Sequence, residues 1–330
     1  MNKDRILYLD IARVLAMLWI VCYWHVKDYV EIGETHSAMT LYGDVYITDT
    51  MLGVFMFLSG FFLAKYTFEN FQDDCKAFYA KRLTRFYLLY AVSAVLLFVI
   101  GFNPDTQTLI TTLTVTSTYI LPQPRTLWFL SMLASFYLFT PLMLRHRHKS
   151  LVVNSLLMFS GGVFLHLLLP KGIDIRFFWC FPLYGIGLYV GMNRKVMAFL
   201  TTDVVGLMAI VVSVFIVIRL QQDKGHGDWI YYLMFPFGVI SVIYISKSLS
   251  RLPVKKVVSI LAYCSMSAYI FHRVIYSVLK KVIYGILGYD FSYLFCFAVF
   301  IPTCLIGAYL IQICYDRYVL PRLICERKRS

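Results

Sequence analysis

Ionisable residues, among them Asp10, Arg13 and His25, lie in the first apolar stretch of the chain, residues 6–29. An ionisable group inside a membrane span costs about 2.5 kcal/mol or more, so it is a functional hypothesis by default. Asp10 and Arg13 are three residues apart, so they can share one helical face and partly neutralise each other. His25 is the candidate for proton transfer, because a neutral imidazole accepts a proton near pH 7.

Two of these residues also have an interpretation without chemistry. The Arg13 side chain can extend along the helix to the headgroups on the N-terminal side of the membrane. His25 can be a hydrogen-bonded histidine near the opposite interface. The residues around them must decide between these interpretations.

The composition excludes a soluble protein. Of the 330 residues, 60% are hydrophobic and only 15% are charged, whereas soluble domains average about 45–50% apolar residues. The net charge of +13 fits the Lys- and Arg-rich cytoplasmic loops of a membrane protein better than a nucleic-acid partner. The eight cysteines never form a C-x-x-C pair, so the sequence indicates neither a metal site nor a disulfide framework.

Apolar runs of the length needed to cross a bilayer, about 20 residues, recur along the chain and predict an all-α bundle of about ten spans in a single domain, residues 1–330. The expected spans are residues 6–29, 46–66, 84–103, 127–144, 151–169, 177–192, 203–220, 229–246, 257–279 and 291–313. The stretch 104–126 is too polar to span and is expected to form an external loop. Most Lys and Arg residues fall on the side of the N-terminus, which predicts that both termini are cytoplasmic.

Six short motifs follow one another along residues 9–272. They are Leu9-Asp10-x-x-Arg13 with the later His25, Val54–Leu63 (VFMFLSGFFL), Lys81–Phe86 (KRLTRF), Leu127–Leu130 (LWFL) with Phe136–Leu142 (FYLFTPL), Phe181–Gly187 (FPLYGIG) and Ser265–His272 (SMSAYIFH). Their types and order resemble the acyltransferase-3 family. These bacterial multi-pass membrane enzymes move acyl groups, commonly acetyl, onto extracytoplasmic glycans.

The resemblance implies a membrane O-acyltransferase of the bacterial inner membrane, surrounded by lipids. Its donor would be cytoplasmic acyl-CoA, most simply acetyl-CoA, used as a co-substrate with no permanently bound cofactor. Its acceptor would be a hydroxyl of an extracytoplasmic glycan or lipid-linked saccharide. The oligomeric state stays open. A transporter or flippase of an amphipathic substrate, or a non-catalytic sensor or assembly protein with the same fold, are the alternatives.

Within that chemistry, His25 is expected to be the general base or to carry the acyl group covalently. Asp28, one helical turn further on, can orient its ring. Trp128 is expected to stack on a sugar or to anchor the chain at the interface. His272 is either a second polar group near the site or a packing histidine.

A basic segment is expected to bind the donor. Lys81, Arg82 and Arg85 suit the phosphates of acyl-CoA, although the positive-inside rule alone also accounts for them. Arg13, deeper in the same half of the membrane, is expected to meet the pantetheine arm or a phosphate and is included with His25 in the catalytic set.

One departure from the family pattern affects the first span. Eleven residues separate Arg13 from His25, whereas the family usually has ten. At about 100° per residue, the family spacing keeps the two side chains within about 20° of each other, and one more residue moves them to about 120°. Either a π-bulge absorbs the extra residue or the two side chains face different parts of the bundle.

Overall fold

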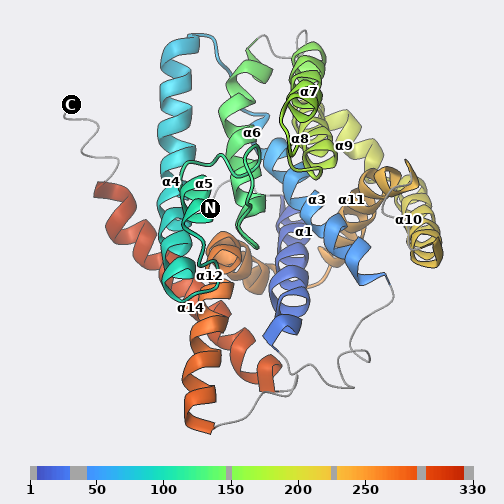
Figure 1. Cartoon of the computed structure of the whole chain (residues 1–330). Coiled ribbons are helices and arrows are strands. Elements are labelled where there is room, and N and C mark those ends of the chain that lie inside the picture. Colours follow the sequence, from blue (N-terminus) through green and yellow to red (C-terminus); the bar gives the residue numbers. More distant parts are fainter. Residues whose placement is uncertain (1–5, 30–42, 146–150, 224–228, 288–294, 323–330) are drawn as a thin grey trace.

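The computed structural model describes residues 6–29, 43–145, 151–223, 229–287 and 295–322, and every regular element among them is helical (Figure 1). Residues 1–5 and 323–330, which hold the two termini, lie outside the described residues. The elements are α1 (Leu7–Leu18), η1 (Trp19–Trp24), η2 (Val26–Tyr29), α3 (Asp44–Leu63), α4 (Phe71–Val99), α5 (Thr106–Leu113), α6 (Trp128–Leu144), α7 (Leu151–Leu168), α8 (Phe177–Met192), α9 (Arg194–Leu200), α10 (Asp203–Asp223), α11 (Trp229–Leu249), α12 (Lys255–Leu287), η4 (Cys296–Phe300), α14 (Ile301–Cys314) and η5 (Tyr315–Val319).

The expected all-α transmembrane bundle is confirmed. Eight helical segments of the described chain are long and apolar enough to cross a membrane. The two remaining expected spans are shorter apolar helices, α6 and α8. All ten expected spans are therefore helical. The outer surfaces of α7 and α10 are covered with exposed leucine, valine and phenylalanine side chains, as lipid-facing helices require.

The first span changes helix type partway along. Its second part, η1, is a π-helix over Trp19–Trp24, and the backbone N–H of His25 bonds to the carbonyl of Ile20, five residues earlier, at 3.0 Å. A π-turn accommodates one residue more than an α-turn. The first of the two alternatives for the Arg13–His25 spacing, a π-bulge, is thus what the structure contains.

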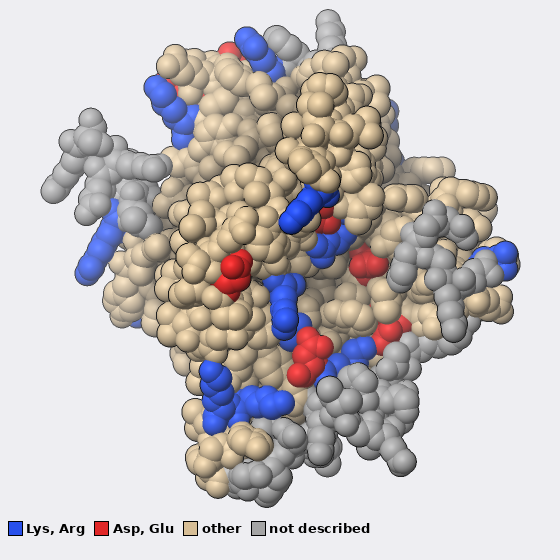
Figure 2. All heavy atoms as spheres, in the orientation of Figure 1, with Lys and Arg blue, Asp and Glu red and all other residues tan. Residues whose placement is uncertain are grey.

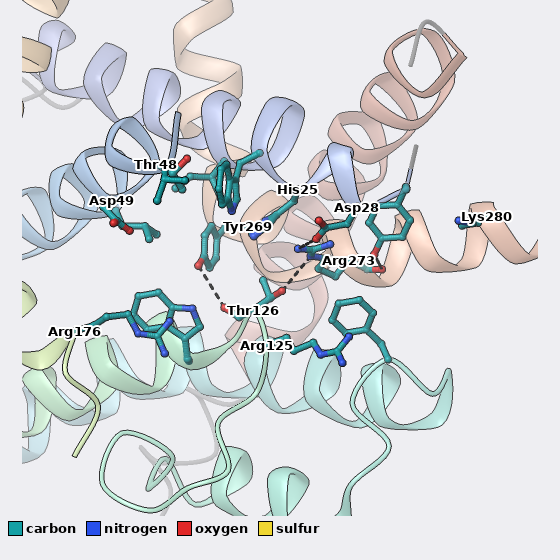
Figure 3. A pocket seen from close by; sticks show the side chains of 17 residues that line it. His25, Asp28, Thr48, Asp49, Arg125, Thr126, Arg176, Tyr269, Arg273 and Lys280 are labelled. Atoms are coloured by element: carbon teal, nitrogen blue, oxygen red, sulfur yellow. Dashed lines mark hydrogen bonds and ion pairs between the residues drawn. The ribbon is translucent and has the colours of Figure 1, made fainter. Parts of the chain in front are cut away.

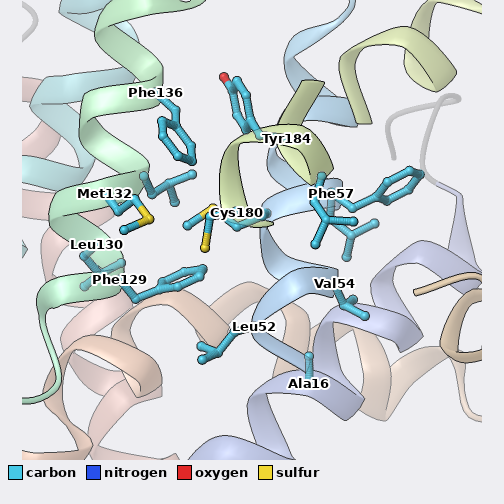
Figure 4. Close-up of a cluster of buried hydrophobic side chains, with 14 of the residues drawn as sticks. Ala16, Leu52, Val54, Phe57, Phe129, Leu130, Met132, Phe136, Cys180 and Tyr184 are labelled. Carbon is cyan, nitrogen blue, oxygen red and sulfur yellow. The ribbon is translucent and has the colours of Figure 1, made fainter. Parts of the chain in front are cut away.

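Small residues allow α3 and α8 to pack closely. A Cβ atom on Gly60 would overlap the backbone carbonyl of Tyr184, and one on Gly187 would overlap that of Phe57. Gly185, in the same helix, has only the Ser155 hydroxyl nearby, at 3.8 Å. The two backbones therefore touch along one stripe of α8, which fixes both helices beside α6 in the aromatic core (Figure 4).

The expected external loop, residues 104–126, contains the short helix α5. The side-chain hydroxyl and the backbone N–H of Thr108 both donate to Asp105 at the start of α5, and these bonds hold the pKa of that carboxyl below its usual value. The loop is fixed to the bundle at its far end, where the Tyr269 hydroxyl of α12 donates to the Thr126 carbonyl at 3.4 Å. This attachment places residues 125 and 126 beside α12.

Candidate active site

A cavity of about 610 Å³ opens at the end of the bundle where the first span finishes and where α3, α6 and α8 begin. In the expected orientation this end is the outer one. The face shown in Figure 2 is hollowed near its middle, where positively and negatively charged side chains gather. The cavity is lined by Ile20, Trp24, His25, Asp28, Tyr29, Val45, Thr48, Asp49, Leu52, Phe102, Arg125, Thr126, Trp128, Arg176, Tyr269, Arg273 and Lys280 (Figure 3). Three site residues expected from the sequence, His25, Asp28 and Trp128, are among them.

Two histidines from opposite ends of the sequence meet at the cavity wall. Nε2 of His272 lies 2.7 Å from Nδ1 of His25, and the two rings are nearly parallel, with their centroids 4.7 Å apart. His272 is fully buried, whereas His25 follows the π-helix at the edge of the cavity. His272 therefore lies directly beside His25, although it does not itself line the cavity.

The partners of His272 determine where the hydrogen atoms of the pair lie. Its Nδ1 is 2.8 Å from the carbonyl of Tyr269 and 3.2 Å from that of Ala268. Carbonyl oxygens only accept, so Nδ1 donates, and Nε2 of the neutral ring is then an acceptor. That acceptor requires a hydrogen on Nδ1 of His25. The free lone pair of His25 is consequently on Nε2, at the edge of the ring turned away from His272.

Asp28 has a different partner from the one expected. Its carboxylate pairs with Nη2 of Arg273 at 2.5 Å, while His272 supplies the hydrogen bond to the His25 ring that the sequence assigned to Asp28. Arg273 also donates from Nε to the Thr126 hydroxyl at 3.1 Å (Figure 3). Asp28 thus lines the cavity as part of an ion pair.

Trp128 lies under a guanidinium group. The Cζ atom of Arg176 is 3.5 Å from the Trp128 ring centroid, and Arg176 is held by both carboxylate oxygens of Asp174 at 2.9 and 3.0 Å and by the amide oxygen of Gln123. One face of the indole is therefore covered. Stacking of a sugar on Trp128, which stays a prediction, would use the opposite face or the edge of the ring.

Arg13 lies elsewhere in the bundle. It is 3.9 Å from Asp10 and its guanidinium sits over the Phe62 ring at 4.8 Å, and it does not line the cavity. Arg13 lies in α1, before the π-helix, some two-thirds of a span away from His25.

The basic segment of α4 does not form one cluster. Arg82 turns inward and donates from Nε to the Tyr66 hydroxyl at 3.0 Å. Arg85 has a different neighbour, Asp316 of η5, at 3.4 Å, and Lys81 is exposed. Because successive residues of a helix are about 100° apart, Lys81 and Arg82 point in different directions. Donor binding by these three residues stays a prediction.

Sequence reasoning missed most of the cavity's charged lining. The motifs singled out neither Arg125, Arg176 and Arg273 nor Asp49, whose carboxylate accepts a hydrogen bond from Tyr231 at 2.8 Å. A usable signal existed for Arg273, because it follows His272 directly within a long apolar helix. The roles of Arg125 and Arg176 depend on loops, whose position the sequence pattern does not determine.

The chain was compared with protein families, curated proteins and solved structures. The model of the acyltransferase-3 family, described as an acyltransferase domain, matches residues 6–313. No curated protein and no solved structure matches the chain.

Proposed function

Because the chain belongs to the acyltransferase-3 family and is a multi-pass membrane acyltransferase, we propose that it transfers an acyl group from acyl-CoA to a sugar hydroxyl. The acyl group is most simply acetyl, and the donor is cytoplasmic. The acceptor is an extracytoplasmic glycan or a lipid-linked saccharide at the bacterial inner membrane. The observation that carries this proposal is the hydrogen-bonded pair of His25 and His272 at the wall of a polar cavity.

In the proposed reaction, Nε2 of His25 accepts the proton of the acceptor hydroxyl while that oxygen attacks the thioester carbonyl. The C–S bond then breaks, and the imidazolium of His25 returns the proton to the departing thiolate. His272 fixes the tautomer, since its Nε2 accepts the Nδ1 hydrogen of His25 throughout. An acyl-His intermediate would use the same Nε2 atom as nucleophile, so both routes need the hydrogen-bonding pattern described above.

The donor is proposed to enter from the opposite end of the bundle. Arg82 and Arg13 lie there, and Arg13 is about 18 Å along the first span from His25 at about 1.5 Å per residue. The phosphates of acyl-CoA would bind near these guanidinium groups, with the pantetheine arm extended toward the cavity. The thioester and the hydroxyl would then meet at His25 from opposite sides of the membrane.

The test is release of free CoA by the purified full-length protein in detergent or nanodiscs supplied with acetyl-CoA. The proposal expects CoA release that saturates with donor and rises when an acceptor glycan is added. A transporter would release no CoA, and a non-catalytic relative would bind acetyl-CoA without consuming it. Either of these results would overturn the proposal.

A second measurement addresses the acceptor. The surface glycans of cells with and without this protein should differ in ester-linked acyl groups, measured after mild alkaline release. Identical ester content in the two strains, with the protein present in the membrane, would contradict a glycan acceptor.

A further inference from the structure

We infer that the acceptor carries an anionic group, a carboxylate or a phosphate, which binds between Arg273 and Arg125 on the cavity wall beside His25. This inference rests on the proposed function, because it names the class of acceptor used at the same site. It adds a specificity determinant that the histidine pair does not supply.

Arg273 is the first of the two basic residues that we propose to bind the anion. Its side chain is only 6% exposed. Nη2 pairs with Asp28 and Nε bonds to the Thr126 hydroxyl, but Nη1 is buried and has no hydrogen-bond partner among the described residues. A buried charged donor without a partner is strongly unfavourable. Since Arg273 lines the cavity, a ligand oxygen is the natural partner for Nη1.

Asp28 does not already satisfy this guanidinium. Its carboxylate contacts one edge of the fork, and the Asp28 side chain is 58% exposed, so water screens its charge. A guanidinium has five N–H donors in a fixed plane and binds oxyanions through two of them. The geometry therefore leaves room for a second anion beside the ion pair.

Arg125 is the second of these two basic residues. Its Cζ atom is 5.9 Å from the centre of the Phe102 ring, and that of Arg273 is 5.3 Å from the same ring. Arg125 also directly precedes Thr126, which receives the hydrogen bond from Arg273. Both guanidinium groups thus lie next to Phe102, and all three residues line the cavity. Within the described chain, Arg125 makes no ion pair with a carboxylate, and its recorded contact is the ring of Phe102.

Two other charged residues of the cavity already have partners. Arg176 is neutralised by Asp174, and the Asp49 carboxylate is bound by Tyr231. Figure 3 shows Asp49 and Arg176 on the side of the cavity away from Arg273. Because His272 and Arg273 are consecutive, α12 carries both the residue that positions the base His25 and the proposed anion-binding group. An anionic sugar held by Arg273 would thus present a neighbouring hydroxyl to His25.

The test is equilibrium binding of radiolabelled pyrophosphate and radiolabelled glucuronate to the purified full-length protein in neutral detergent at constant ionic strength. Glucose serves as the uncharged probe. We expect saturable binding of at least one anion and none of glucose. Arg273→Gln and Arg125→Gln should each weaken binding by about tenfold or more. Lys255→Gln, at an exposed position at the start of the same helix, should leave it unchanged.

The two anions distinguish the sources of the charge. Preference for pyrophosphate points to a lipid-linked pyrophosphate sugar, and preference for glucuronate points to an acidic sugar. Binding of neither anion, or binding unaffected by Arg125→Gln, would overturn the inference. Arg125→Gln keeps the test valid if Arg273→Gln does not fold, since Arg125 makes no ion pair with any residue that the structure describes. Binding that is lost in Arg82→Gln but kept in Arg125→Gln would place the anion at the donor end and would also overturn it.

Acetyl-CoA turnover is measured in the same preparations. Turnover without anion binding would remove the inference and leave the proposed function standing. If the wild-type protein shows neither turnover nor anion binding, the proposed function and the inference both fall.

Discussion

Replacing His272 by leucine should slow acyl transfer strongly without affecting donor binding. His272 contacts His25 and not the cavity, so its role is to position the ring and select its tautomer. Leucine cannot accept the Nδ1 hydrogen, which removes the reason for the lone pair to stay on Nε2 of His25. The lost bond, 2.7 Å long in a buried site, is worth about 1–3 kcal/mol. This corresponds to a fall of about 5- to 150-fold in kcat.

Glutamine at the same position is the matched control. Its amide oxygen can accept a hydrogen bond, as Nε2 of the neutral histidine does. His272→Gln should therefore recover kcat to within about fivefold of wild type, whereas His272→Leu should not. The assay is CoA release by purified variants, with thermal unfolding measured beside it to establish that both are folded. The KM for acetyl-CoA should stay within about twofold in both.

Two results would refute this reasoning. One is a folded His272→Leu variant with wild-type kcat, which would make the histidine pair irrelevant to catalysis. The other is a folded glutamine variant as slow as the leucine variant, which would mean that acceptance of the Nδ1 hydrogen is not what His272 contributes.

Three further predictions concern the donor end, the packing and the topology. Combining Arg82→Ala with Arg85→Ala should raise the KM for acetyl-CoA by about tenfold or more, since charge-assisted phosphate contacts are worth about 1.5–3 kcal/mol each; an unchanged KM in a folded protein would contradict donor binding there. Gly187→Ala should destabilise the fold by about 1–3 kcal/mol through overpacking against α3, measured by unfolding in detergent, whereas Gly185→Ala should not, and equal effects would contradict the packing described. A reporter fused after Arg194 should report the cytoplasm, and the opposite result would reverse the topology and the donor side.

The sequence was sufficient to predict the spans and the position of His25. Apolar runs of bilayer length are a local property, so all ten expected segments are helices. The spacing between Arg13 and His25 was also informative, because the extra residue required either a π-turn or a change of face, and η1 is a π-helix.

The contacts between spans were beyond the sequence. The hydrogen bond from His25 to His272 joins residues far apart in the chain, and no periodicity encodes it. The expected role of Asp28 in orienting His25 followed from helical spacing alone. In the structure the Asp28 carboxylate pairs with Arg273 of α12. Lys81, Arg82 and Arg85 form one run in sequence and yet point at different neighbours, because tertiary partners decide where long basic side chains lie.

The most direct test of the catalytic role of His25 compares the turnover of His25→Gln with that of His166→Gln. His166 of α7 accepts a hydrogen bond from the backbone of Ile173, away from the cavity, so its replacement controls for the general effect of losing a partly buried histidine. The measurement is CoA release under saturating acetyl-CoA, with the dissociation constant for the donor measured in the same samples. We expect the rate of CoA release to fall by about 10²- to 10⁴-fold in His25→Gln with donor binding retained. The rate of His166→Gln should stay close to that of the wild type. Near-normal turnover by a folded His25→Gln variant would contradict a catalytic role for His25.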